Sequence, residues 1–158
     1  MTPSPQPHKG YRQNVGIVLT DGNGQVWVGE RADTPGSWQM PQGGVDEGED
    51  LLSAARRELF EEVGTPPDEL ELLAIHPQWL GYTLPEMVQK KSGVSFKGQT
   101  QKWFLFEYQL GDEINLDRAQ DDEFADWKWV TPEWILEHIV EFRRPVYEQV
   151  FKEFNKYF

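Results

Sequence analysis

The chain contains no cysteine, and basic residues are scarce relative to acidic ones. Without cysteine, neither a disulfide framework nor a thiolate metal site can form. With 15 Lys and Arg against 27 Asp and Glu, the formal net charge is −12, which argues against binding nucleic acid through a broad basic surface. The charge still permits a small basic pocket, or an anionic substrate approached through metal ions.

A long apolar run is also absent. The first ten residues, MTPSPQPHKG, contain no apolar signal segment, and no run of about 18 apolar residues occurs in the sequence. We therefore expect a cytoplasmic protein that does not insert into a membrane.

The residues that are present are typical of a globular domain. Apolar residues make up 38% of the 158 residues and aromatic residues 13%, including seven Trp. This length suffices for one domain with a substantial core. We predict a flexible, proline-rich leader over residues 1–10 and a single domain over residues 11–158.

Periodicity and turn residues predict the elements of this domain. Runs rich in β-branched and aromatic residues predict strands at 14–20, 25–31, 37–44, 69–82 (one strand or two), 101–110 and 123–130. The first two flank the turn sequence DGNG and form a predicted hairpin. Helices are predicted at 46–64, 131–138 and 144–158, and a surface loop at 85–100. This order predicts an α/β (α+β) fold in which a mixed sheet lies between helices.

The helix predicted over residues 46–64 is the clearest of these elements. Asp46 is its expected N-cap, Glu49 completes a capping box three residues later, and Gly64 ends the helix. The apolar residues that recur at helical spacing, and form the expected buried stripe, are Leu52, Ala55, Leu59 and Val63.

Three glutamates of this helix share one face. Glu58, Glu61 and Glu62 follow the i, i+3, i+4 spacing, so their carboxylates are crowded and repel one another unless cations neutralise them. Carboxylate oxygens are the ligands that Mg²⁺ and Mn²⁺ prefer. Two interpretations stand: a divalent-metal platform for phosphate-anhydride chemistry, or a solvated helix face on which Arg57 pairs with Glu61. The helix alone favours the second.

The surrounding residues favour the first interpretation. The stretch GGVDEGEDLLSAARRELFEEVGT, residues 43–65, resembles the Nudix box, the loop–helix–loop signature of hydrolases that act on nucleoside diphosphates linked to another group. The matching positions are Gly43, Glu49, Arg57, Glu58, Leu59, Glu61, Glu62 and Gly64. Thr65 departs from the box, where an aliphatic residue is usual, and this concerns packing rather than chemistry.

The box can also be interpreted physically. Gly43 and Gly44 permit a tight turn and close approach of the backbone. We expect Glu49 to hydrogen-bond back to the loop and Arg57 to hold Glu61 in place, as supports for the metal-binding carboxylates. The resemblance implies that Glu58, Glu61 and Glu62 bind Mg²⁺, with Mn²⁺ as the alternative ion, and Glu61 is our first choice of general base.

The resemblance extends beyond the box, from Gly10 to Phe154. Segments such as SWQMPQGG, QKWFLFEY and WVTPE are similar to the subgroup that contains plant-type diadenosine tetraphosphate hydrolases and bacterial RNA 5′-pyrophosphohydrolases. By this resemblance, Glu123 supplies a further metal-side carboxylate. The residues implied in substrate binding are Arg12 and Arg31 at the phosphates, Tyr82, Phe142 and Arg143 at the nucleobase, and Ser37 and Gln99 as polar contacts.

Several of these residues have simpler interpretations. Taken alone, Glu123 reads as an acid at a strand edge, Phe142 as a core residue, and the phosphate-site arginines as surface residues. Where the subgroup has Lys, this chain has Arg143, which keeps the charge but changes the donor geometry. The lysines of the predicted loop, Lys90, Lys91 and Lys97, are expected to be solvated.

The resemblance implies Mg²⁺-assisted hydrolysis of diadenosine tetraphosphate to ATP and AMP. The alternative is removal of pyrophosphate from 5′-triphosphorylated RNA by the same chemistry, and the charge of −12 mildly favours the smaller substrate. A nucleotide-sugar hydrolase is a weaker third reading. A non-catalytic nucleotide-binding module is disfavoured because the box glutamates are complete. We expect a small nucleotide or an RNA 5′ end as partner, and neither a membrane nor an obligate protein partner.

Overall fold

Two long strands, β1 (Arg12–Thr20) and β7 (Gly98–Tyr108), run parallel through the middle of the sheet in the computed structural model of the chain. The structure describes residues 1–66, 70–86, 96–108 and 114–158. The described strands form one mixed sheet with the path β3-β2-β1-β7-β5, from which β4 pairs with β1, β6 with β7 and β8 with β2. The remaining strands are β2 (Val26–Arg31), β3 (Trp38–Gln39), β4 (Gln42–Gly44), β5 (Leu70–Ile75), β6 (Leu80–Thr83) and β8 (Phe124–Val130).

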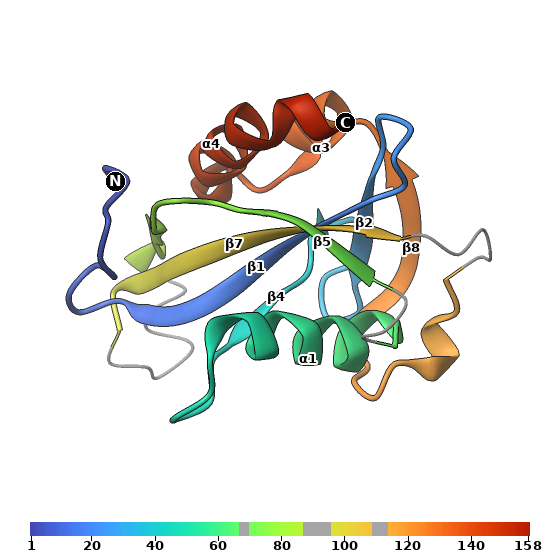
Figure 1. Cartoon of the computed structure of the whole chain (residues 1–158), viewed down its shortest axis with the longest axis horizontal. Helices are drawn as coiled ribbons and strands as arrows, with labels where there is room; N and C mark the ends of the chain where they lie inside the picture. The colour runs from blue at the N-terminus through green and yellow to red at the C-terminus, as the bar shows by residue number, and fades with distance from the viewer. Residues whose placement is uncertain (67–69, 87–95, 109–113) are drawn as a thin grey trace.

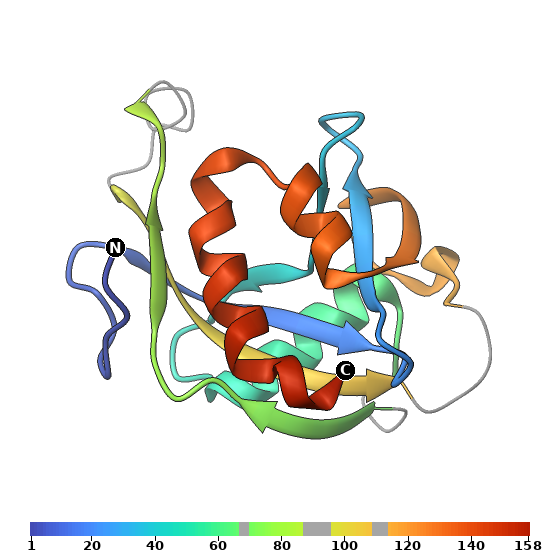
Figure 2. The same ribbon diagram turned by 90° about the horizontal axis from the view of Figure 1, so that it is seen from above.

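Helices cover both faces of this sheet. Helix α1 (Leu51–Val63) lies on one face, and α3 (Pro132–His138) and α4 (Arg144–Phe154) lie on the other (Figures 1 and 2). Residues 14–20 of β1 are therefore buried on both sides, and the core divides into two apolar clusters. The predicted fold, a mixed sheet between helices, is confirmed.

Helix α1 begins five residues later than predicted, at Leu51, and its N-cap is Asp50 rather than Asp46. Gly48 has a φ of 77°, a left-handed conformation that an α-helix cannot include, so the preceding residues form a turn. Within that turn the Asp46 amide donates to Glu49 Oε1 at 3.0 Å, which is the reciprocal half of the predicted capping box. The Asp50 carboxylate accepts from the Ser53 amide at 3.2 Å and so caps the N-terminus of α1.

Other boundaries also differ from the prediction. The segment 37–44 contains two short strands, β3 and β4, and the segment 69–82 contains β5 and β6. Strand β7 begins at Gly98, inside the predicted surface loop, and Lys90 and Lys91 of that loop lie outside the described residues. Helix α4 ends at Phe154 and is followed by a 3₁₀ turn.

The proline-rich segment 1–10, predicted as a flexible leader, is joined to the sheet by hydrogen bonds at two points. Ser4 and Trp79 exchange backbone hydrogen bonds of 3.0 and 2.7 Å. The His8 ring contacts the Thr100 hydroxyl at 2.7 Å. In the described part of the chain, no helix is long and apolar enough to span a membrane.

Candidate active site

Arg57 connects helix α1 to the loop that precedes it. Its guanidinium donates to both carboxylate oxygens of Glu49 at 2.8 and 2.9 Å, and to the Gly44 carbonyl at 2.8 Å. It also donates to Glu58 Oε1 at 2.9 Å and to Glu61 Oε2 at 3.1 Å. The hydrogen bond to Arg57 lowers the pKa of the Glu49 carboxyl, and the Glu49 bond is the main cause of the raised pKa of Arg57. Arg57 thereby fixes the loop and the acidic face of the helix relative to each other.

Two glycines of the box have conformations or surroundings that exclude a side chain. A Cβ atom at Gly43 would overlap the Glu58 carboxylate, so the missing side chain is what lets strand β4 pass directly beside that glutamate. Gly64 has a φ of 82°, and its amide donates to the carbonyls of Leu59 and Phe60 at 3.1 Å. This left-handed cap ends α1 at its expected position.

Glu58 and Glu62 lie buried against each other on α1. Their side chains are hydrogen-bonded, with residue exposures of 7% and 5%. Burial raises the pKa of both carboxyls. For Glu62 the negative charges of Glu58 and Glu123 add to the effect and raise the pKa to about 10. Glu62 Oε2 is buried with no hydrogen-bond partner.

Two further acids border this pair from the segment before β8. Glu123 is half-buried and its carbonyl accepts from the Ala32 amide at 3.0 Å. The Asp121 amide donates to the Glu61 carbonyl at 2.9 Å. The charge of Asp121 also raises the pKa of Glu62, by less than burial and the charges of Glu58 and Glu123 do. The structure therefore places the four predicted acids near one another and adds Asp121, which was missed because its contact with Glu61 joins residues far apart in sequence.

The carboxylate cluster, defined here as Glu58, Glu61, Glu62 and Glu123, has the chemistry of a divalent-cation site. As the side chains stand, no three acidic or histidine groups among the described residues converge closely enough to hold an ion. Arg57 takes one oxygen of Glu58 and one of Glu61, and the side chains of Glu58 and Glu62 are hydrogen-bonded to each other. A hard cation would satisfy the buried, unpartnered oxygen of Glu62 and would offset the burial and the neighbouring negative charges that raise the pKa of this carboxyl. The residues therefore fit such an ion.

A second group of predicted residues comes from strand β6 and the 3₁₀ turn before α4. The rings of Tyr82 and Phe142 are 5.5 Å apart, and the Arg143 guanidinium is 5.7 Å from the first and 5.4 Å from the second. Arg143 is buried, and its Nη1 donates to the side-chain oxygen Oε1 of Gln39. The structure thus brings the three residues predicted for a nucleobase together.

Arg31 is within electrostatic reach of both Tyr82 of the aromatic group and Glu123 of the acids. Its guanidinium forms two hydrogen bonds of 2.9 and 2.8 Å with Asp33, and a third of 3.3 Å with Gln39 Oε1. The Asp33 hydrogen bond raises the pKa of Arg31, and Glu123 and Tyr82 act on it in the same direction, against the effect of burial. Ser37 lies in the turn after Arg31, where its carbonyl accepts from the Arg31 amide at 2.8 Å.

Gln99 belongs to a set of amide side chains on the sheet. Its Oε1 accepts from the side chain of Asn14 and from Gln42 Nε2, the latter at 3.5 Å. Gln42 Nε2 also donates to the Tyr82 hydroxyl at 3.2 Å. These partners, together with Gln39, were missed from the sequence, because an isolated glutamine carries no distinctive spacing signal.

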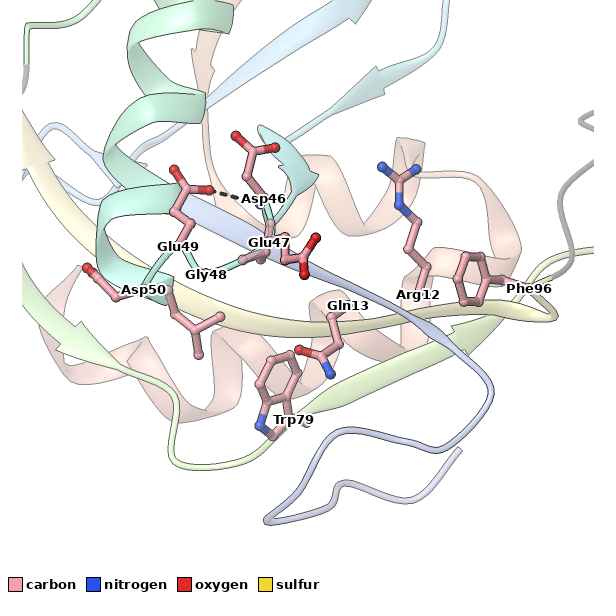
Figure 3. Close-up of a pocket in the computed structure, with 11 residues that line it drawn as sticks. Arg12, Gln13, Asp46, Glu47, Gly48, Glu49, Asp50, Trp79 and Phe96 are labelled. Carbon is pink, nitrogen blue, oxygen red and sulfur yellow. Dashed lines mark hydrogen bonds between the residues drawn. The ribbon is translucent and has the colours of Figure 1, made fainter.

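Arg12 lies on the other side of the box loop. It is exposed at the start of β1, and a Cβ atom at Gly44 would come within 2.7 Å of its Nη2. It lines an open hollow of about 720 Å³ together with Phe96, Trp79 and the acidic turn 46–50 (Figure 3). Arg12 thus borders the box loop at this hollow, and Lys97 is exposed just before β7.

The fold, the box loop and the acidic helix face together define a class. Residues 10–150 match the NUDIX domain family, so the chain belongs to the Nudix family and is a Nudix hydrolase. Members of this family generally use divalent metal ions.

The same comparisons find individual proteins that are similar to this chain. Nudix hydrolase 27, chloroplastic, of Arabidopsis thaliana is 48% identical, covering 96% of this chain and 69% of that protein. The RNA pyrophosphohydrolase of Dinoroseobacter shibae is 44% identical, covering 98% of both chains. In the crystal structure of a binary complex of Ap4A hydrolase from C. elegans, the fold is similar with a TM-score of 0.68, over 93% of this chain and 99% of that one. At 22% identity, that last likeness concerns the fold alone.

Proposed function

We propose that the protein hydrolyses a phosphoanhydride bond in the polyphosphate chain of a nucleotide, with dinucleoside tetraphosphate cleaved to ATP and AMP as the leading reaction. The observation that carries this proposal is the buried Glu58–Glu62 pair beside Gly43, with the unpartnered Glu62 oxygen. Such a pair is costly without a cation, because burial and like charge both oppose ionisation.

In the proposed reaction Glu58, Glu61, Glu62 and Glu123 hold Mg²⁺, for which Mn²⁺ can substitute. The bound ion would neutralise phosphate charge and lower the pKa of an attacking water. Glu61 is the proposed general base, since it is the most exposed of the box glutamates on α1, with 26% of its side chain accessible. Arg57 orients it through the 3.1 Å hydrogen bond.

The substrate would extend from the acids towards the aromatic pair. Arg31 lies close enough to Glu123 to feel its charge, and its fork of donors suits phosphate oxygens. Tyr82 and Phe142 offer ring faces to a nucleobase, with Arg143 beside both rings. Ser37 and Gln99 are proposed as polar contacts, and Arg12 as a phosphate contact at the box loop.

A second candidate reaction is removal of pyrophosphate from 5′-triphosphorylated RNA. Relatives named RNA pyrophosphohydrolase, from Dinoroseobacter shibae and Rhodospirillum rubrum, are 44% and 48% identical over almost their whole lengths. The net charge of −12 favours the dinucleotide, because RNA affinity draws on many phosphate contacts. Both reactions need the same acids and the same base-binding group.

The decisive comparison is kcat/KM for diadenosine tetraphosphate and for a short 5′-triphosphorylated RNA, at one salt concentration and saturating Mg²⁺. We expect ATP and AMP from the first substrate, at an efficiency at least tenfold higher than pyrophosphate release from the RNA. A large preference for the RNA would make the second candidate the function. No turnover of either substrate would overturn the proposal as a whole.

A further inference from the structure

Gln39 connects two arginines that come from distant parts of the chain. It lies in β3 and is 1% exposed, and its side-chain carbonyl oxygen accepts from Arg31 Nη1 at 3.3 Å and from Arg143 Nη1. Arg31 ends β2, and Arg143 ends the 3₁₀ turn before α4. One neutral oxygen therefore sets the distance between two guanidinium groups.

The positive charge at this point is only partly compensated. Arg31 has Asp33 as a partner, but that carboxylate is on the surface, with 65% of its side chain exposed. For Arg143 the structure shows no ion pair with any carboxylate of the described residues, and its Nε is buried without a hydrogen-bond partner. A buried, unpaired guanidinium costs free energy in the unliganded protein. The arrangement is therefore suited to an anion that arrives from outside.

Through these two arginines, Gln39 is connected to both the acidic end and the aromatic end of the proposed site. On one side, Arg31 is close enough to Glu123 for that charge to act on it. On the other side, Arg143 contacts the rings of Tyr82 and Phe142. A chain of phosphates that runs from the acids to a base held by these rings would pass both arginines.

We propose that Gln39 is a positioning residue that holds Arg31 and Arg143 for the polyphosphate chain without itself neutralising either charge. This inference rests on the proposed function, of which it specifies the phosphate-binding part. A carboxylate at the same position would hold the arginines equally well, but it would neutralise them. An aliphatic side chain would neutralise nothing, but it would not hold them.

The two alternatives define the test variants. Gln39→Glu keeps the size and the acceptor oxygen, so we expect a folded protein whose KM for diadenosine tetraphosphate rises about tenfold or more, with kcat changed less than about threefold. Gln39→Met keeps the length without the acceptor, and we expect it to raise KM and lower kcat together. Gln149→Glu, at an exposed position of α4, adds the same charge without touching the Gln39 hydrogen bonds and serves as the control.

Equilibrium binding separates this inference from the proposed function. We expect Gln39→Glu to weaken ATP binding about tenfold and adenosine binding less than about twofold, as measured by titration calorimetry, with Gln149→Glu like wild type. A purely structural role would change the melting temperature and affect ATP and adenosine equally. Equal ATP affinity in wild type and Gln39→Glu would overturn the inference, as would wild type binding ATP no tighter than adenosine. Absence of hydrolysis with an intact ATP–adenosine difference would overturn the proposed function alone.

Discussion

Replacing Glu62 by glutamine should stabilise the metal-free protein at neutral pH. The side chain is 5% exposed, lies against Glu58 and leaves one oxygen without a partner. Glutamine has almost the same shape and no charge, and its amide can donate to the Glu58 carboxylate in place of the protonated Glu62 carboxyl. The substitution therefore removes the cost of burying an acid without creating a cavity.

The size of the effect follows from the raised pKa. Burial, the charge of Glu58 and that of Glu123 raise the pKa of Glu62 from 4.5 to about 10. At pH 7 the unfolded chain releases this proton and the folded chain keeps it, which favours unfolding by about 3 kcal/mol. For a domain of this length that corresponds to about 6–12 °C in the melting temperature.

The sign of the pH dependence is fixed by the same shift. Below about pH 4.5 both states are protonated, so Glu62→Gln and wild type should have equal stability apart from packing. As the pH rises from there towards the folded pKa, wild type loses stability relative to the variant. With Mg²⁺ present, wild type should become more stable than Glu62→Gln, since an ion held by the ionised cluster stabilises the folded wild type by mass action.

The assay is thermal unfolding of both proteins from pH 4.5 to pH 9, first with a chelator and then with Mg²⁺. The reasoning would be refuted by a variant that is less stable than wild type at pH 7 without metal. It would also be refuted by a stability difference that does not grow with pH, or by equal stabilisation of both proteins by Mg²⁺.

Two further predictions concern the residues around the cluster. Gly43→Ala places a methyl group where the Glu58 carboxylate lies, so we expect a loss of about 1–3 kcal/mol in urea unfolding and at least a tenfold loss of kcat; unchanged kcat would contradict the close approach. Asp33→Asn removes the ion-pair partner of Arg31. The Asp33 carboxylate is ionised throughout the assay range, because Arg31 lowers its pKa to about 2. The freed guanidinium should lower KM for the polyphosphate substrate at low salt with little change in melting temperature, and a raised KM would show that Asp33 helps to position Arg31.

Much of the fold could be predicted because its signals are local. Thr131 and Pro132 mark the start of α3 as predicted, with the Thr131 hydroxyl accepting from the Trp134 amide at 3.2 Å. The start of α1 was placed wrongly because Asp46 and Asp50 are both plausible caps. Only the left-handed conformation of Gly48 decides between them.

The residues of the site could likewise be predicted where their signals are local, and not where their contacts are distant in sequence. The box spacing within one helix places Glu58, Glu61 and Glu62 on one face, so their proximity could be predicted from periodicity alone. The contacts of Gln39 with Arg143 and of Asp121 with Glu61 could not be predicted, since they join residues far apart in sequence that only the folded structure brings together. The contact between Gln39 and Arg143, for example, joins residues 104 positions apart.

The central claim is that the carboxylate cluster is the site of metal-assisted hydrolysis. Its most direct test is the turnover of diadenosine tetraphosphate and 5′-triphosphorylated RNA at saturating Mg²⁺ by wild type, Glu58→Gln and the exposed control Glu137→Gln on α3. We predict that Glu58→Gln lowers kcat at least a hundredfold in a protein that melts no lower than wild type, while Glu137→Gln is unchanged. Near-normal turnover by a folded Glu58→Gln variant would contradict the account.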